Sequence, residues 1–188
     1  MSRAAVFMDR DGTLIEEHGY LDRLELLSLY PWTGDAIRLL NRAGLVTVVI
    51  TNQAAVARGI IDETFVATVH REIDARLGRA RINAYYHCPH LAEAPVERYR
   101  QVCACRKPAA GMIERACRDL DIDPERSFTV GDRWLDVICG RRGGTRALLV
   151  RSGHGGHEED HPHAGVQADA ILNNLMEAVG WILRSSSR

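Results

Sequence analysis

Four short apolar runs along the chain predict β-strands. Each run is rich in alanine, valine, isoleucine, leucine or phenylalanine and ends at polar residues. Near-continuous apolar runs of this length are typical of strands that are buried on both faces. The predicted strands are residues 4–8, 45–51, 127–130 and 146–150.

Segments with apolar residues at helical spacing lie between and after these runs. In one of them, Phe65, Val69, Ile73 and Leu77 form a single apolar stripe. Strands that alternate with helices indicate an α/β fold, a Rossmann-like doubly wound parallel sheet with helices on both sides. The predicted helices are residues 34–44, 62–78, 110–120 and 171–183.

Polar side chains stand where three of the four predicted strands end. Asp9 and Asp11 follow the first strand, Thr51 and Asn52 the second, and Asp132 the third. Because ligands of parallel sheets bind beyond the carboxyl ends of the strands, these residues predict a binding site at that edge.

Residues 86–106 interrupt the alternation with a segment rich in cysteine, histidine and proline. It contains a Cys-x-His pair, Cys88 and His90, and a Cys-x-Cys pair, Cys103 and Cys105. Three thiolates and one imidazole suit tetrahedral structural zinc, with no open position for catalysis. Reduced thiols beside a surface histidine are the alternative.

A second irregular segment, residues 151–163, carries His154, His157, His161 and His163 between glycines and acidic residues. Such a stretch could bind a transition metal. We expect a solvated surface loop, which is the more common structure for this composition.

Composition and charge exclude several classes of protein. The 188 residues suffice for one domain, residues 1–188, and the net charge of −1 gives no broad field for nucleic acid or an acidic membrane. No apolar stretch is long enough to span a bilayer. The first strand begins too early for a signal peptide, and an odd count of five cysteines argues against a disulfide framework. We therefore expect a cytoplasmic monomer, with Cys117 and Cys139 as small buried hydrophobic residues.

The paired aspartates predict the chemistry. Residues two apart in a strand share a face, so the carboxylates of Asp9 and Asp11 can point into one crevice, and Gly12 permits a sharp turn after them. Like charges held close together repel, and a divalent cation with a preference for oxygen ligands, such as magnesium, relieves that repulsion.

With Thr13, the two aspartates complete an Asp-x-Asp-x-Thr motif, through which the chain resembles the haloacid dehalogenase-like phosphatase superfamily. Thr51, Lys107 and the stretch GDRWLD, residues 131–136, match the other motifs of that superfamily in order.

The resemblance implies phosphoryl transfer through an aspartyl-phosphate. Asp9 would be the nucleophile and Asp11 the general acid and base. Magnesium would be held by Asp9, the backbone carbonyl of Asp11, and Asp132, while Lys107 and Thr51 would bind the phosphoryl oxygens.

Asp136 lies one helical turn beyond Asp132. It would support the water shell of the magnesium ion or serve only as a charge at a helix N-terminus.

The cysteine segment, with DRDGTLIEEHGYL, TNQAAVARG and CRKPAAGM, is similar to the D-glycero-D-manno-heptose 1,7-bisphosphate 7-phosphatases, small enzymes without a large cap domain. In that family a sugar phosphate is the substrate, and Ala54 and Ala55 stand where its members usually have serine and glycine. Arg133 stands where they usually have lysine. By this resemblance the following residues face the substrate: Glu17, His18, Gly19, Tyr20, Asn52, Gln53, Arg106 and Arg133.

Other functions remain open at this stage. The same motifs are similar to those of histidinol-phosphate phosphatase, and another small phosphomonoester is possible as substrate. A zinc-bearing binding module with a relic site is disfavoured by the intact motif residues. A phosphatase of nucleic-acid ends ranks last, because the chain shows no basic groove or aromatic platform.

Overall fold

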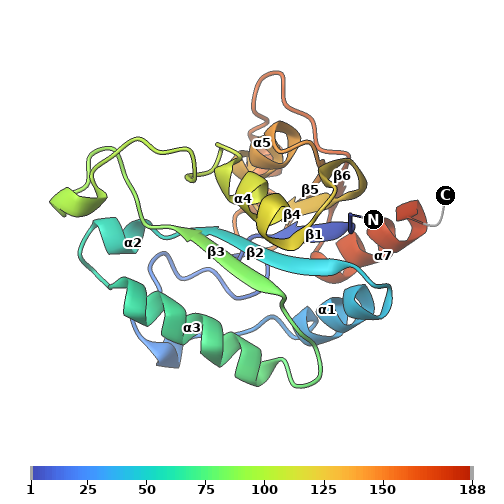
Figure 1. The fold of residues 1–188 in the computed structure, drawn as a ribbon, viewed down its shortest axis with the longest axis horizontal. Coiled ribbons are helices and arrows are strands. Elements are labelled where there is room, and N and C mark those ends of the chain that lie inside the picture. The colour runs from blue at the N-terminus through green and yellow to red at the C-terminus, as the bar shows by residue number, and fades with distance from the viewer. Residues whose placement is uncertain (1, 187–188) are drawn as a thin grey trace.

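The computed structural model of the chain describes residues 2–186. Its centre is a six-stranded sheet in which every neighbouring pair is parallel, in the order β3-β2-β1-β4-β5-β6 (Figure 1). The strands are β1 Ala5–Met8, β2 Val46–Asn52, β3 Ala84–Cys88, β4 Phe128–Gly131, β5 Arg146–Val150 and β6 Ala170–Leu172.

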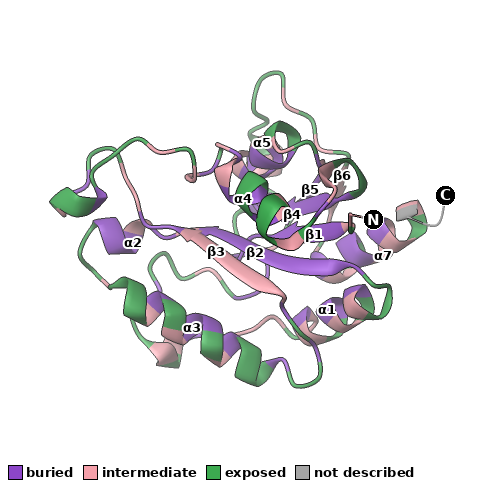
Figure 2. Cartoon of the chain, viewed as in Figure 1, coloured by how far each residue is buried: buried purple, intermediate pink, exposed green. Residues whose placement is uncertain are grey.

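The four strands predicted from apolar runs are β1, β2, β4 and β5, the inner strands, and their residues are buried almost throughout (Figure 2). The two strands that the sequence pattern missed, β3 and β6, are the edge strands, and most of their residues are only half-buried. An edge strand packs against one neighbour only, so it does not require a continuous apolar run.

Helices connect the strands. The predicted helices correspond to α1, α3, α4 and α7, although residues 171–172 of the last prediction belong to β6 instead. The short α2, α5 and α6 were not predicted, and α6 lies within the expected surface loop at residues 151–163. The helices are α1 Thr33–Arg42, α2 Ala54–Ala57, α3 Glu63–Arg76, α4 Gly111–Leu120, α5 Trp134–Arg142, α6 Gly155–Asp160 and α7 Leu175–Ser186.

Both faces of the sheet are covered, as expected for a doubly wound fold (Figure 1). Val6 and Met8 of β1 belong to the apolar cluster beneath α1, α3 and α7. The alternate residues, Ala5 and Phe7, contact the cluster that α4 contributes to on the opposite face. Because successive side chains of a strand point to opposite faces, an inner strand between two helical layers is apolar at every position.

The strand order reverses between β1 and β4. The backbone N–H of Asp9, directly after β1, donates to the carbonyl of Val130 in β4 at 2.9 Å. Crevices in open α/β sheets form at such a reversal, so the residues that follow β1 and β4 are brought together there.

The segment between β3 and α4 contains one short 3₁₀ turn, Glu97–Tyr99. Ala94 and Tyr99 from this segment are buried in a small cluster with Val56 of α2 and Val66 of α3. The segment therefore has some apolar packing in addition to its cysteine cluster.

Within residues 2–186, no helix combines the length and the apolar character needed to cross a bilayer.

Candidate active site

A cavity of about 470 Å³ opens at the carboxyl ends of the strands. Most of the predicted site residues line it, including Asp9, Asp11, Thr51, Lys107 and Asp132. His18 does not line this cavity, and its Nε2 lies 3.8 Å from a carboxylate oxygen of Glu16. The lining comprises Asp9, Arg10, Asp11, Glu17, Gly19, Tyr20, Leu21, Thr51, Asn52, Gln53, Ala54, Ala55, Arg58, Leu91, Arg106, Lys107, Asp132, Arg133, Leu135 and His154.

Three buried carboxylates meet at the floor of the cavity. Asp9, Asp132 and Asp136 each offer an oxygen within 4.8 Å of the others. Oδ2 of Asp132 accepts the backbone N–H of His154 at 2.8 Å, whereas its buried Oδ1 has no hydrogen-bond partner within residues 2–186. A buried oxygen without a partner is costly unless a ligand satisfies it. A hard divalent cation suits this donor set.

The electrostatics of the cluster agree with a bound cation. Burial raises the pKa of Asp9 to about 7, with Asp136 and Asp11 adding to the rise and Lys107 opposing it. Burial, together with Asp9 and Asp136, raises the pKa of Asp132 to about 9. The carboxylates thus resist ionising together in the protein alone, and a dication would remove that resistance.

Lys107 is fully buried between two of these carboxylates. Its Nζ lies 2.8 Å from Oδ1 of Asp9 and 2.6 Å from Oδ1 of Asp136, and it donates to the carbonyl of Ile50 at 3.0 Å. Burial alone would lower the pKa of Lys107, but Asp136 and Asp9 raise it above its usual value. The ammonium group is therefore held as a cation beside the candidate nucleophile.

Asp136 lies at a helix N-terminus, one of its two expected positions, and also contacts Lys107, which was not predicted. Its Oδ2 accepts the backbone N–H of Arg133 at 3.0 Å and so caps α5, while Oδ1 contacts Lys107. The carboxylate thus caps a helix N-terminus and orients the lysine.

Asn52 was predicted to face the substrate and lines the cavity. Its side-chain amide also pairs with the backbone of Lys107: Nδ2 donates to the carbonyl at 3.0 Å, and Oδ1 accepts the N–H at 3.0 Å. The end of β2 is thereby joined to the segment that carries the lysine.

Asp11 is surrounded by hydrogen-bond donors. Arg10 approaches it with Nε 3.1 Å from Oδ2 and Nη2 3.0 Å from Oδ1. Gln53 donates from Nε2 to the same Oδ2 at 3.1 Å, and the hydroxyl of Thr51 lies 3.4 Å from it. Arg10 was not among the residues predicted to form the site, although its position between the two aspartates was a visible signal.

The rim of the cavity is cationic. Arg106 donates from Nη1 to the carbonyl of His90 at 3.0 Å, which ties it to the cysteine segment. Arg133 lies with Nε 3.4 Å from a carboxylate oxygen of Glu158 in α6. Arg58 and His154, which the sequence analysis did not assign to the site, also line the cavity. Anionic groups of a ligand would be attracted to this rim.

Ala54 and Ala55 begin α2 and line the cavity. Among the residues that the structure describes, Asp121 is the one non-glycine residue with a positive φ. Alanine therefore meets no backbone strain at residue 55, where the related enzymes usually have glycine.

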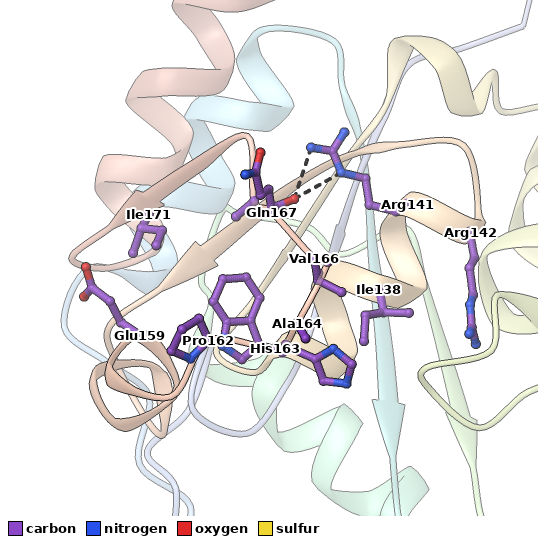
Figure 3. A pocket seen from close by; sticks show the side chains of 13 residues that line it. Ile138, Arg141, Arg142, Glu159, Pro162, His163, Ala164, Val166, Gln167 and Ile171 are labelled. Carbon is purple, nitrogen blue, oxygen red and sulfur yellow. Dashed lines mark hydrogen bonds between the residues drawn. The ribbon is translucent and has the colours of Figure 1, made fainter.

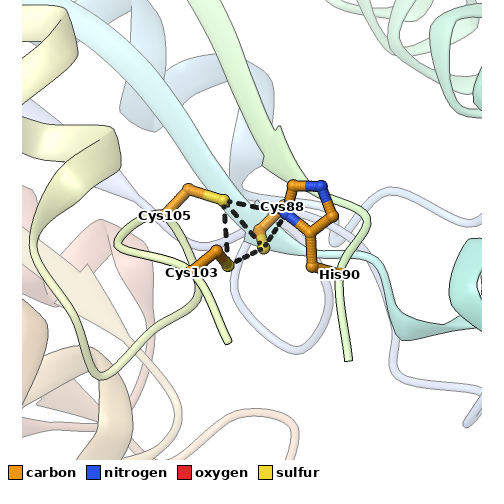
Figure 4. A group of neighbouring side chains, drawn as sticks. All are labelled: Cys88, His90, Cys103 and Cys105. Atoms are coloured by element: carbon orange, nitrogen blue, oxygen red, sulfur yellow. Dashed lines mark hydrogen bonds between the residues drawn. The ribbon is translucent and has the colours of Figure 1, made fainter. Parts of the chain in front are cut away.

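The four predicted zinc ligands converge at the end of β3 (Figure 4). Their donor atoms all lie within 4.8 Å of one another, and Sγ of Cys105 is 3.0 Å from Sγ of Cys88 and 3.4 Å from Nδ1 of His90. Three sulfurs and one imidazole nitrogen at such separations fit a tetrahedral zinc site. The third sulfur of this cluster is Sγ of Cys103.

Cys117 and Cys139 lie outside this cluster, as expected. Both residues belong to the apolar cluster to which α4 contributes: Cys139 is fully buried in it, and Cys117 packs half-buried against it.

A larger cavity, of about 860 Å³, lies elsewhere, against α5 and residues 162–168 (Figure 3). Its lining is mainly apolar, and Arg141 at its edge donates to the carbonyl of Gln167 at 3.2 and 3.4 Å. None of the predicted site residues lines it. The smaller, polar cavity is therefore the candidate active site.

The chain is similar to known proteins. A family model described as HAD-hydrolase-like matches residues 104–178. The chain is 36% identical to the D-glycero-beta-D-manno-heptose-1,7-bisphosphate 7-phosphatase of Haemophilus ducreyi, over 97% of this chain and 100% of that protein. It is 38% identical to the D-glycero-D-manno-heptose-1,7-bisphosphate 7-phosphatase of Thermosynechococcus vestitus, over 97% of this chain and 96% of that protein.

A crystal structure of the D,D-heptose 1,7-bisphosphate phosphatase from B. bronchiseptica, complexed with magnesium and phosphate, has a TM-score of 0.86 to this chain at 25% identity. The match covers 97% of this chain and 99% of that one. The similarity in sequence and in fold therefore extends over nearly the whole molecule.

Proposed function

Because the chain belongs to the haloacid dehalogenase-like family of the D-glycero-D-manno-heptose-1,7-bisphosphate 7-phosphatases, we propose that it removes the 7-phosphate of D-glycero-D-manno-heptose 1,7-bisphosphate. The product would serve the synthesis of nucleotide-activated heptose. The observation that carries this proposal is the meeting of Asp9, Asp11, Lys107 and Asp132 at one cavity.

The reaction proceeds in two steps. A carboxylate oxygen of Asp9 attacks phosphorus, the bond between phosphorus and the sugar oxygen breaks, and Asp11 gives its proton to that oxygen. Asp11, now ionised, takes a proton from a water molecule, which attacks the aspartyl-phosphate and releases inorganic phosphate and free Asp9.

Lys107 and Thr51 stabilise the charge on the phosphoryl oxygens. The ammonium group of Lys107 is 2.8 Å from Asp9, so it lies beside the atom to which phosphorus becomes bonded. Preorganised donors of this kind supply much of the catalysis in phosphoryl transfer, because they are in place before the charge develops.

Magnesium fits the site, and Asp9, Asp132 and the backbone carbonyl of Asp11 would hold it. The partnerless Oδ1 of Asp132 supports this assignment. When bound, the ion neutralises charge between the nucleophile and the phosphoryl oxygens.

Zinc has a structural function in this proposal. Its ligands are Cys88, His90, Cys103 and Cys105, and the last of them is followed directly by Arg106 and Lys107. A metal at this place would fix the segment that brings both cations to the site.

The rest of the sugar phosphate meets the rim. We assign it to Glu17, Gly19, Tyr20, Asn52 and Gln53 of the lining and to the cations Arg106 and Arg133. His18, which was also predicted to face the substrate, is not part of this lining. Arginine binds phosphate bidentately, so the phosphate remote from the reaction belongs near Arg106.

We further propose a cytoplasmic monomer with no nucleic-acid or membrane partner. None of the five cysteines, all of which the structure describes, forms a disulfide, which suits a reducing compartment. The exposed large hydrophobic residues of the described chain, Tyr20, Leu39, Ile60 and Val102, come from four different segments and suggest no broad interface.

The test is phosphate release with magnesium on a panel of substrates: the α and β anomers of heptose 1,7-bisphosphate, fructose 1,6-bisphosphate and histidinol phosphate. We expect strong preference for one heptose anomer. Asp9→Asn, which keeps the shape and lacks the nucleophile, should lower turnover at least about 10³-fold.

Two outcomes would contradict the proposal. A preference for histidinol phosphate would assign the chain to that related activity. Weak activity of similar size on all four substrates would mean that the loop with Ala54 and Ala55 has changed the substrate.

A further inference from the structure

Arg10 is a buried cation that the proposed reaction has not used. Its side chain is 3% exposed and lies between the candidate nucleophile and the candidate acid in sequence. Removing a guanidinium group from water is costly, and a buried ion pair is weak evidence for stability. A position of this kind therefore calls for a function other than folding.

The hydrogen bonds of Arg10 are directed at one carboxylate. Nε and Nη2 bind the two oxygens of Asp11 at 3.1 and 3.0 Å, a bidentate geometry that fixes the plane of the carboxylate. Nη2 also donates to Oε1 of Gln53 at 3.0 Å.

Gln53 also binds Asp11 and so joins the two residues in one hydrogen-bond network. Its Nε2 donates to Oδ2 of Asp11 at 3.1 Å and to the hydroxyl of Thr51 at 2.9 Å. Oδ2 of Asp11 is thereby held 3.4 Å from Thr51, the residue proposed to bind the phosphoryl group. The carboxylate of Asp11 is thus held beside the proposed phosphoryl-binding residue.

Among the described residues, Asp11 is the carboxylate with which Arg10 forms an ion pair. His70 is buried in the same region, and its pKa is lowered to about 3, by burial first and then by the charge of Arg10, so it is neutral. Nη1 of Arg10 has no hydrogen-bond partner among the described residues.

We infer that Arg10 is a positioning residue for the proposed reaction: with Gln53 it holds Asp11 in the orientation in which that carboxyl group protonates the leaving oxygen and later deprotonates water. The inference rests on the proposed function, because it concerns the proton transfers of that mechanism. Arg10 itself forms and breaks no bond to phosphorus.

The test separates proton transfer from the rest of the reaction. A sugar alkoxide leaves only if it is protonated, whereas a nitrophenolate departs without a proton. In Arg10→Met we expect kcat on the best alkyl phosphate substrate to fall about 10²-fold. The burst rate that reports phosphorylation of Asp9 by p-nitrophenyl phosphate should stay within about threefold of wild type, followed by slower turnover.

Three further variants control the result. Asp11→Asn should show the same split, and the double variant Arg10→Met/Asp11→Asn should be no slower than Asp11→Asn alone, because Arg10 acts through Asp11. Arg10→Lys keeps the buried charge without the bidentate contact. If Arg10→Met does not fold, Arg10→Lys should still show a loss confined to the alkyl phosphate.

Equal losses on both substrates would overturn the inference, because they would indicate a direct contact of Arg10 with phosphate. An alkyl phosphate turnover within about threefold of wild type would also overturn it. Since the split is measured on whichever alkyl phosphate reacts best, a failure of the heptose preference would be recognised separately.

Discussion

At the scale of single residues, Gly12 decides how closely the loop after β1 approaches Asp132. Its φ of +77° is unfavourable for residues with a side chain, and a Cβ at this position would overlap Oδ2 of Asp132. Gly153 approaches the same point from the other side, and its Cβ would meet that same oxygen. The carboxylate can occupy its place only because both neighbours lack a side chain.

We therefore predict different outcomes for two glycine substitutions. Gly12→Ala and Gly44→Ala both introduce a Cβ at positive φ, which costs about 1 kcal/mol in each case. The Cβ at residue 44 meets nothing within 4 Å, whereas that at residue 12 displaces Asp132.

Phosphatase assays and urea unfolding check this prediction. Without urea, activity should fall at least about tenfold in Gly12→Ala and remain near wild type in Gly44→Ala. The midpoint of unfolding should be lower in Gly12→Ala than in Gly44→Ala, because only the Cβ at residue 12 displaces a buried carboxylate. Equal activities of the two variants would show that the close approach to Asp132 is unimportant.

At the scale of elements, the segment between β3 and α4 carries Arg106 and Lys107 to the site, and the two residues are held differently. Arg106 is tied to the carbonyl of His90, within the cysteine segment. Lys107 is bound through Ile50 and Asp136, which belong to β2 and α5. Loosening the segment should therefore disturb the arginine more than the lysine.

Removal of the proposed zinc ion should accordingly weaken substrate binding more than turnover. For Cys105→Ser we expect a loss of bound zinc and a KM for the bisphosphate raised about tenfold, with a smaller fall in kcat, because one charge-assisted phosphate contact is loosened. Zinc content and steady-state kinetics provide the measurement. Cys117→Ser, which removes a cysteine outside the cluster, should keep both zinc and KM. Undiminished activity of the zinc-free variant would refute the prediction.

At the scale of the whole molecule, a buried histidine makes global stability depend on pH. His70 of α3 is 8% exposed and stacks on Tyr85 of β3, with ring centroids 4.3 Å apart. Burial lowers its pKa from 6.5 to about 3. Below pH 6.5 the unfolded chain therefore binds a proton at this residue that the folded protein does not take up.

The direction of the change in stability with pH follows from that difference in proton binding. Stability is unaffected by His70 above its ordinary pKa and falls as the pH drops from 6.5 toward 3. At pH 5 the loss amounts to about 2 kcal/mol. Urea unfolding of wild type and His70→Gln at pH 7.5 and pH 5 provides the measurement. The wild type should lose about 2 kcal/mol more than the variant over this interval, and equal losses would contradict the prediction.

The sequence by itself determined the inner strands, most of the helices and the motif residues that line the candidate active site. β1, β2, β4 and β5 were predictable because burial on both faces demands a continuous apolar run. Asp9 and Asp11 were recognisable because they stand two residues apart. Thr51 and Asp132 were recognisable because they lie at the ends of strands of one parallel sheet.

Only the tertiary structure decided what depends on contacts between distant segments. The edge strands β3 and β6 form by pairing with a single neighbour, which leaves no periodic signal. The contact of Arg10 with Gln53 spans 43 positions, and Asp136 reaches Lys107 from another element. Hydrophobic periodicity reports which face of an element is buried, whereas the partner of a buried charge is fixed only when the elements meet.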